Sequence, residues 1–169
     1  LLGPQVRSGR PVVRVAARDN GYSVHTADGA SAEVDGVIFA CPASAFESLQ
    51  LDFPGGDATR SVATIPHSSL VTVSLGYRRE HVAHPLDGSG LLAPSSEGRR
   101  ILGTLFPSTL FPERVPAGHV LLTAFAGGMR HPEVAEMTDA SIVEMVRAEL
   151  RDLLGAAGEP AFCEVRRWR

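Results

Sequence analysis

The residue types that most often do chemistry are present in this sequence, but their spacing predicts no self-contained site. Six histidines and two cysteines occur among the 169 residues. His81 and His84 form an HxxH pair, which could bind a metal only on a helix, and the following Pro85 opposes a helix there. Cys41 and Cys163 are far apart and form no CxxC motif. We therefore expect no metal site.

No catalytic residue is predicted either. The sequence contains no GxGxxG, GxxxxGK[ST], HExxH or GxSxG motif. Glu113, Glu133 and Glu136 show no pairing that would define an acid and a base, and His67 and His131 each stand beside a proline, as loop or strand-end residues do. Any difficult chemical step would therefore fall to a cofactor, with the protein binding and orienting the reactants.

Composition narrows the class of protein. Hydrophobic residues make up 44% of the chain, as in globular proteins. The 16 basic residues, all arginine, stand against 19 acidic ones, so there is no basic field to hold a nucleic acid. No apolar run is long enough to span a membrane and no signal peptide is evident. Two isolated cysteines favour a reducing, cytoplasmic location. The two ends look cut, as in an internal piece of a longer protein.

Residues 1–52 have the pattern of a β-rich unit. The sequence alternates as in half-buried strands at residues 13–15, 22–25 and 34–40, with turns at 19–21 and 27–29. This pattern predicts a three-stranded antiparallel meander. Residues 37–41 are apolar on both faces, which predicts a buried strand, with Cys41 at its end, that joins a larger sheet. Left unpaired, such an edge should make the chain self-associate. Pro42 then opens a short helix.

The second part, residues 53–169, alternates in a different way. Its elements are expected to be a short helix at 57–63, strands at 69–77, 100–106, 119–126 and 161–165, and one long helix capped by Thr138 and ended by Gly155. A break at residues 54–56 separates it from the meander. The fold class predicted is α+β or α/β: an antiparallel β-meander followed by a mixed-sheet unit with one long helix.

Several stretches, in order, resemble the flavin-containing amine oxidase superfamily and, within it, the protoporphyrinogen and coproporphyrinogen oxidases of haem synthesis. These stretches are residues 9–15, 37–42, 65–77, 88–97, 101–108, 110–114 and 122–128, followed by a final Val-x-x-Trp at 165–168. The resemblance implies FAD as the cofactor, with residues 1–52 as part of the FAD-binding domain and 53–169 as an incomplete substrate-binding domain. It also implies that Val12 contacts the adenine and that Ala40 and Pro42 support the cofactor site.

The same resemblance implies where the substrate binds. Leu92, Leu105 and Phe125 correspond to the apolar residues that pack on the tetrapyrrole rings, which suits a large apolar macrocycle. Ser89 stands in the middle of a GxG where an aromatic residue is common, and Pro107 replaces a common acidic residue. The first departure leaves the choice between proto- and coproporphyrinogen open.

The implied activity is oxidation of a porphyrinogen to the porphyrin by FAD in successive two-electron steps, with oxygen as acceptor. This chain alone is expected to be inactive, and the parent protein could associate peripherally with a membrane. Two alternatives remain: another flavin enzyme of the superfamily, such as an amine oxidase or carotenoid desaturase, or a complete β-rich binding module.

Overall fold

The computed structural model describes residues 5–168, and these form two compact units whose boundary along the chain lies between Pro66 and His67. The domain boundary predicted from sequence lay earlier, between residues 52 and 53. Residues 53–66 belong to the first unit because Phe53, Val62 and Ala63 pack against its core. Each unit is described by itself.

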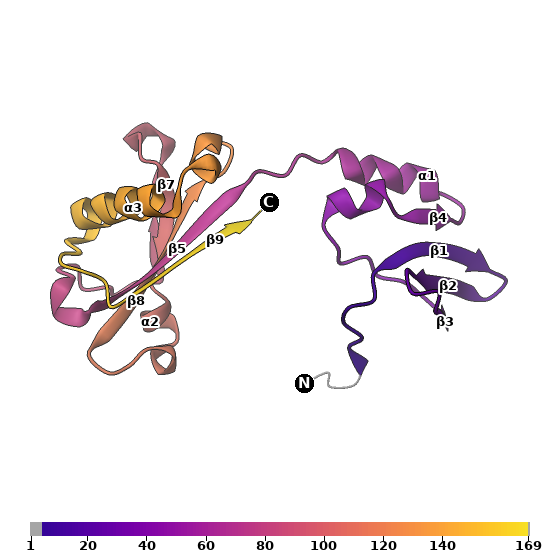
Figure 1. The fold of residues 1–169 in the computed structure, drawn as a ribbon, viewed down its shortest axis with the longest axis horizontal. Helices are drawn as coiled ribbons and strands as arrows, with labels where there is room; N and C mark the ends of the chain where they lie inside the picture. Colours follow the sequence, from indigo (N-terminus) through magenta and orange to yellow (C-terminus); the bar gives the residue numbers. More distant parts are fainter. Residues whose placement is uncertain (1–4, 169) are drawn as a thin grey trace. The chain divides into compact units, whose positions relative to one another are not determined.

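The first unit is a four-stranded sheet with the strand order β3-β2-β1-β4 (Figure 1). Its elements are β1 (Val12–Arg18), β2 (Gly21–Thr26), β3 (Ser31–Val34), a 3₁₀ turn at Ala43–Glu47, β4 (Gln50–Asp52), α1 (Gly56–Thr59) and a 3₁₀ turn at Arg60–Thr64. The three strands of the meander are antiparallel as predicted, but the third lies at Ser31–Val34 and not at residues 34–40. The fourth strand, β4, pairs in parallel with β1. Val15, Phe46, Leu49 and Leu51 form its small core.

The prediction of a buried strand at residues 37–41 is wrong. These residues form no strand, Ile38 is 95% exposed and Cys41 is exposed. Only Val37 and Phe39 turn inward, against the core of the first unit. Apolar composition favours a buried strand only where a neighbouring strand is present to pair with it, and no strand among residues 5–168 does so.

The second unit is a five-stranded sheet with one long helix on one face (Figure 1). Its elements are β5 (Leu70–Arg78), β6 (Gly90–Leu92), β7 (Ile101–Leu105), α2 (Pro107–Leu110), β8 (His119–Gly127), α3 (Asp139–Leu154) and β9 (Phe162–Trp168). The strand order is β6-β7-β8-β5-β9 and every pair is antiparallel. The fold class is confirmed, except that the parallel pair lies in the first sheet and not in the second.

Local sequence explains why α3 begins and ends where it does. The Thr138 hydroxyl accepts a hydrogen bond from the Ser141 backbone N–H at 3.3 Å, as an N-cap does, and Gly155 ends the helix in the left-handed conformation. The buried side of the helix recurs at helical spacing and packs on the sheet; its residues are Ile142, Val146, Leu150 and Leu154.

Strand alternation decides which face of the second sheet is buried. In β5, the side chains at positions 71, 73, 75 and 77 are buried against α3, and in β8 those at 120, 122, 124 and 126 are buried with them. The intervening residues point to the opposite face, which we call the open face. Among residues 5–168, no helix is long and apolar enough to cross a bilayer.

Candidate functional site

The first candidate site is an apolar cleft in the first unit. It has a volume of about 460 Å³ and is lined by both Val12 and Ala40. Its remaining walls come from β1, β2, residues 37–41 and the turn that follows; they are Pro11, Val15, Val24, Val37, Ile38, Phe39, Cys41, Ala45, Ser48 and Leu49. Two of the three predicted cofactor residues are therefore brought together, although 28 positions separate them.

Backbone irregularity gives this cleft its polar groups. The register of β1 against β2 shifts between Val12 and Arg14, and the backbone of residues 37–41 belongs to no ladder in the described chain. Such amides and carbonyls remain free to bind a ligand in an otherwise apolar cleft. Pro42 does not line the cleft. It precedes the turn at Ala43–Glu47, and its carbonyl accepts a hydrogen bond from the Ala45 N–H at 3.0 Å.

A second, smaller cavity of about 190 Å³ adjoins the cleft and shares Val12 and Val24 with it. Arg7, Arg10 and Thr26 are among its lining residues. Arg10 pairs with Asp28 at 3.6 Å, and the Thr26 hydroxyl donates to the Asp28 carboxylate at 2.5 Å. This hydroxyl and the Ala30 N–H hold the pKa of Asp28 below its ordinary value. The cavity therefore keeps an ionised carboxylate beside its arginine.

The second candidate site is the open face of the second sheet. One row of residues crosses all five strands in register: Leu92 on β6 pairs with Gly103 on β7, then follow Phe125 on β8, Thr72 on β5 and Arg166 on β9. In the next row Leu105 pairs with Gly90 and with Thr123. All three predicted substrate residues, Leu92, Leu105 and Phe125, thus lie on this one face.

These side chains do not belong to the hydrophobic core. Leu92 is 87% exposed, Leu105 is exposed and Phe125 is half-buried. Gly103, between Leu92 and Phe125, is buried, and a Cβ there would stand 2.4 Å from the Leu91 carbonyl oxygen, so this position needs a glycine for β6 and β7 to approach closely. The result is a largely apolar surface made by Leu92, Leu105 and Phe125, against which a flat or saucer-shaped ring system could pack.

Ser89 lies just before β6 and is exposed, and its carbonyl accepts a hydrogen bond from the Phe106 N–H at 2.9 Å. Its neighbour Gly90 pairs with Leu105. The loop before it is held by Leu86, whose N–H donates to His84 Nδ1 at 3.0 Å and whose carbonyl accepts from the Thr109 hydroxyl at 2.9 Å. Whether the Ser89 side chain contacts a substrate stays a prediction.

Sequence reasoning missed the polar half of the open face. The Ser74 and Thr123 hydroxyls lie 3.1 Å apart, and Trp168 Nε1 donates to the Thr72 hydroxyl at 3.3 Å. Arg166 completes this half of the face. The alternation of Thr72 and Ser74 with buried valines was the available signal, but only the register shows that they adjoin Phe125.

Within the described residues, no group of three or more histidines, cysteines, aspartates and glutamates is placed to hold a metal ion. On the open face, Arg166 and Glu164 form one exposed ion pair at 3.2 Å. The other titratable side chains of the strands on this face are Arg78 and His119, which pair in register at the end of β5 and the start of β8. The two candidate sites can therefore bind and orient, and an oxidation there would need a cofactor.

Comparison with known proteins shows the family of this chain. The chain matches the family described as flavin containing amine oxidoreductase over residues 1–169. The chain belongs to this family.

The relatives with similar sequences include protoporphyrinogen and coproporphyrinogen oxidases. The chain is 34% identical over 150 residues to the mitochondrial protoporphyrinogen oxidase of Nicotiana tabacum, which covers 86% of the chain and 30% of the relative. It is 23% identical over 164 residues to coproporphyrinogen III oxidase of Bacillus subtilis (strain 168), which covers 97% of the chain and 34% of the relative. The chain thus spans about a third of the length of these relatives.

A solved structure shows the same fold. Cyclohexylamine oxidase from Brevibacterium oxydans IH-35A superposes with a TM-score of 0.63 at 17% identity, covering 94% of this chain and 34% of that one. Similarity at this identity concerns the fold and leaves the substrate open.

Proposed function

We propose that the protein containing this chain is an FAD-dependent oxidase that converts a porphyrinogen to the porphyrin. The observation that carries the proposal is the register of the second sheet, which brings Leu92, Leu105 and Phe125 onto one exposed apolar face. The names of the relatives support it, since they include both proto- and coproporphyrinogen oxidases.

The cleft in the first unit fits part of a flavin nucleotide. Its apolar walls and unpaired backbone suit a planar heterocycle, which buries its faces and hydrogen-bonds at its edge. Val12 and Ala40 would hold it by backbone and van der Waals contact, with Pro42 fixing the turn behind Ala40. The cofactor, when bound, would supply the two-electron oxidation, with oxygen as the acceptor.

The open face would hold the macrocycle. The Phe125 ring and the two leucines would cover its apolar surface. These contacts would orient the macrocycle on this face. We also propose a cytoplasmic location, which the two free cysteines support, and peripheral membrane association of the whole protein.

The test is made on the full-length protein. Its visible spectrum should show bound flavin, and porphyrin fluorescence should rise when a porphyrinogen is added in air. The Phe125→Ala variant should keep the flavin spectrum but raise KM about tenfold or more, because a buried aromatic ring contributes roughly 1.5 to 3 kcal/mol. Bound flavin without porphyrin formation would reject the substrate and favour an amine or polyene instead. Absence of flavin would reject the cofactor assignment.

A further inference from the structure

Arg166 stands at the polar end of the row that carries the predicted substrate residues. It pairs in register with Thr72, which pairs with Phe125, so two strand spacings, about 10 Å, separate Arg166 from Phe125 across the sheet. The Arg166 side chain is 62% exposed. Its position is about as far from Phe125 as the peripheral carboxylates of a tetrapyrrole are from the centre of the ring.

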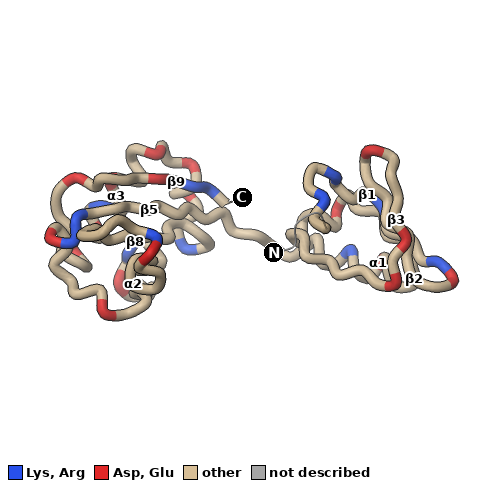
Figure 2. Tube along the Cα trace, turned by 90° about the horizontal axis from the view of Figure 1, so that it is seen from below, with Lys and Arg blue, Asp and Glu red and all other residues tan. Residues whose placement is uncertain are grey.

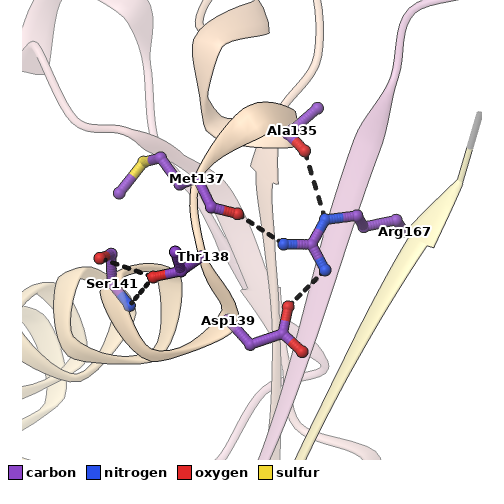
Figure 3. Close-up of polar contacts among 6 residues, drawn as sticks. All are labelled: Ala135, Met137, Thr138, Asp139, Ser141 and Arg167. Carbon is purple, nitrogen blue, oxygen red and sulfur yellow. Dashed lines mark hydrogen bonds and ion pairs between the residues drawn. The ribbon is translucent and has the colours of Figure 1, made fainter.

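The neighbouring residue fixes the direction in which Arg166 points. Arg167 turns to the helix side of the sheet, where its Nε donates to the Ala135 carbonyl at 3.2 Å and its Nη2 to the Met137 carbonyl at 2.6 Å. Its Nη1 pairs with the Asp139 carboxylate at the start of α3 (Figure 3). Since successive side chains of a strand alternate, this clamp directs Arg166 to the open face.

The contacts of Arg166 leave its guanidinium available to a ligand. One nitrogen, Nη2, donates to Glu164 at 3.2 Å, and the guanidinium carbon lies 5.9 Å from the centre of the Trp168 ring. An ion pair this exposed is worth about 0 to 1 kcal/mol, so a second carboxylate can compete for the guanidinium. Trp168 is itself held by its hydrogen bond to Thr72.

A second cationic group borders the open face further along the strands. Arg114 and His119 line an apolar cavity of about 380 Å³ whose floor includes Gly76, Leu121 and Phe162. Gly76 is four residues beyond Thr72 on β5, about 13 Å along the strand. The arginines Arg166 and Arg114 therefore lie at two separate edges of the face; the basic end of β9 is visible in Figure 2.

The two porphyrinogens differ in a way that this arrangement can distinguish. Protoporphyrinogen carries its propionates on one edge of the macrocycle and vinyl groups elsewhere. Coproporphyrinogen carries propionates on every ring, so its carboxylates reach opposite edges. A propionate gains a charge-assisted hydrogen bond from an arginine, whereas a vinyl group gains nothing and removes water from the guanidinium.

We propose that Arg166 binds a substrate propionate and makes this protein prefer coproporphyrinogen to protoporphyrinogen. The inference rests on the proposed function. Arg114 serves a carboxylate at the other edge, and the apolar residues of the open face hold the macrocycle between them.

The test compares kcat/KM for the two porphyrinogens in the full-length, flavin-loaded protein. The wild type should prefer coproporphyrinogen by about tenfold or more. Arg166→Gln should raise KM for coproporphyrinogen by about 10- to 100-fold, as expected when a charged hydrogen bond is lost, with kcat nearly unchanged. The effect on protoporphyrinogen should be less than about threefold, because its propionates share one edge of the ring and can turn to Arg114 instead. Arg166→Lys should recover part of the preference, and Arg151→Gln, an exposed control on α3, should leave it unchanged.

A binding measurement separates recognition from turnover. Coproporphyrin should bind Arg166→Gln more weakly than the wild type in a fluorescence titration, while its tetramethyl ester should bind both equally. An unchanged ratio of kcat/KM in Arg166→Gln, or equal weakening for acid and ester, would overturn the inference and leave the oxidase intact. A wild type that binds flavin but oxidises neither porphyrinogen would overturn the proposed function itself.

Discussion

The contrast between Arg167 and Arg166 gives the sharpest prediction about how the second unit is built. Arg167 joins β9 to the segment that starts α3, and two of its three acceptors are the backbone carbonyls of Ala135 and Met137. Ala135 is buried, so its carbonyl cannot easily turn to water instead. Arg167→Gln should therefore remove two hydrogen bonds from a charged donor in a partly buried place.

The expected loss follows from these contacts. Each hydrogen bond to a charged group contributes about 1.5 to 3 kcal/mol, and the pair with the largely exposed Asp139 adds little. We expect Arg167→Gln to lower the free energy of unfolding of this unit by about 2 to 4 kcal/mol. In a unit of about 100 residues that corresponds to a fall in Tm of roughly 10 °C or more.

Trp168 makes the measurement specific to the second unit, because it is the only tryptophan in the chain. Thermal unfolding followed by its fluorescence should show the large shift for Arg167→Gln. The matched change Arg166→Gln should cost less than about 1 kcal/mol, since it removes only an exposed pair with Glu164 and a distant, exposed contact with the Trp168 ring. Equal losses for the two variants would contradict the alternation of β9, and with it the assignment of Arg166 to the open face.

Three further predictions concern other parts of the chain. Gly155→Ala should destabilise the second unit by about 1 to 3 kcal/mol in thermal unfolding, because φ is +60° there and a new Cβ would lie 2.7 Å from the Ala83 Cβ. The hydrogen bond from Arg147 lowers the pKa of Glu159. The stabilisation from this pair should therefore be present above the ordinary glutamate pKa and be lost as the pH falls through the lowered pKa of Glu159. Arg147→Gln should raise the pKa of Glu159 in an NMR titration. Finally, Ile38→Asp should reduce the self-association that we expect of the isolated chain, as seen in sedimentation, because Ile38 is almost fully exposed.

Elements with a clear local signal could be predicted from the sequence. Three such features are present in the structure: the meander turns, the alternation of β5 and β8, and the capping residues of α3. Each depends on residues that are close together in the sequence. The short strands β4 and β6 were not predicted, because three residues carry too little pattern to identify a strand.

The pairing between segments that are far apart in the sequence could not be predicted. Residues 37–41 have the composition of a buried strand, yet burial depends on a partner that composition does not reveal. Likewise, the resemblance identified Leu92 and Phe125 one by one, but only the register through Gly103 shows that they share a face. Arg166 was not singled out because it stands next to Arg167 in the sequence. Only the alternation of side chains along β9 shows that Arg166 points to the open face while Arg167 points to the helix.

The most direct test of the account asks whether the open face takes the porphyrinogen. Leu92→Asp and Met129→Asp each replace a highly exposed apolar residue, one on the open face and one in the turn after β8. Both full-length variants should fold and bind flavin like the wild type, because neither side chain is buried. Leu92→Asp should raise KM for the porphyrinogen at least tenfold, by about 1.4 kcal/mol or more, whereas Met129→Asp should leave it within about twofold. If the two variants keep the same KM, the tetrapyrrole does not bind on this face.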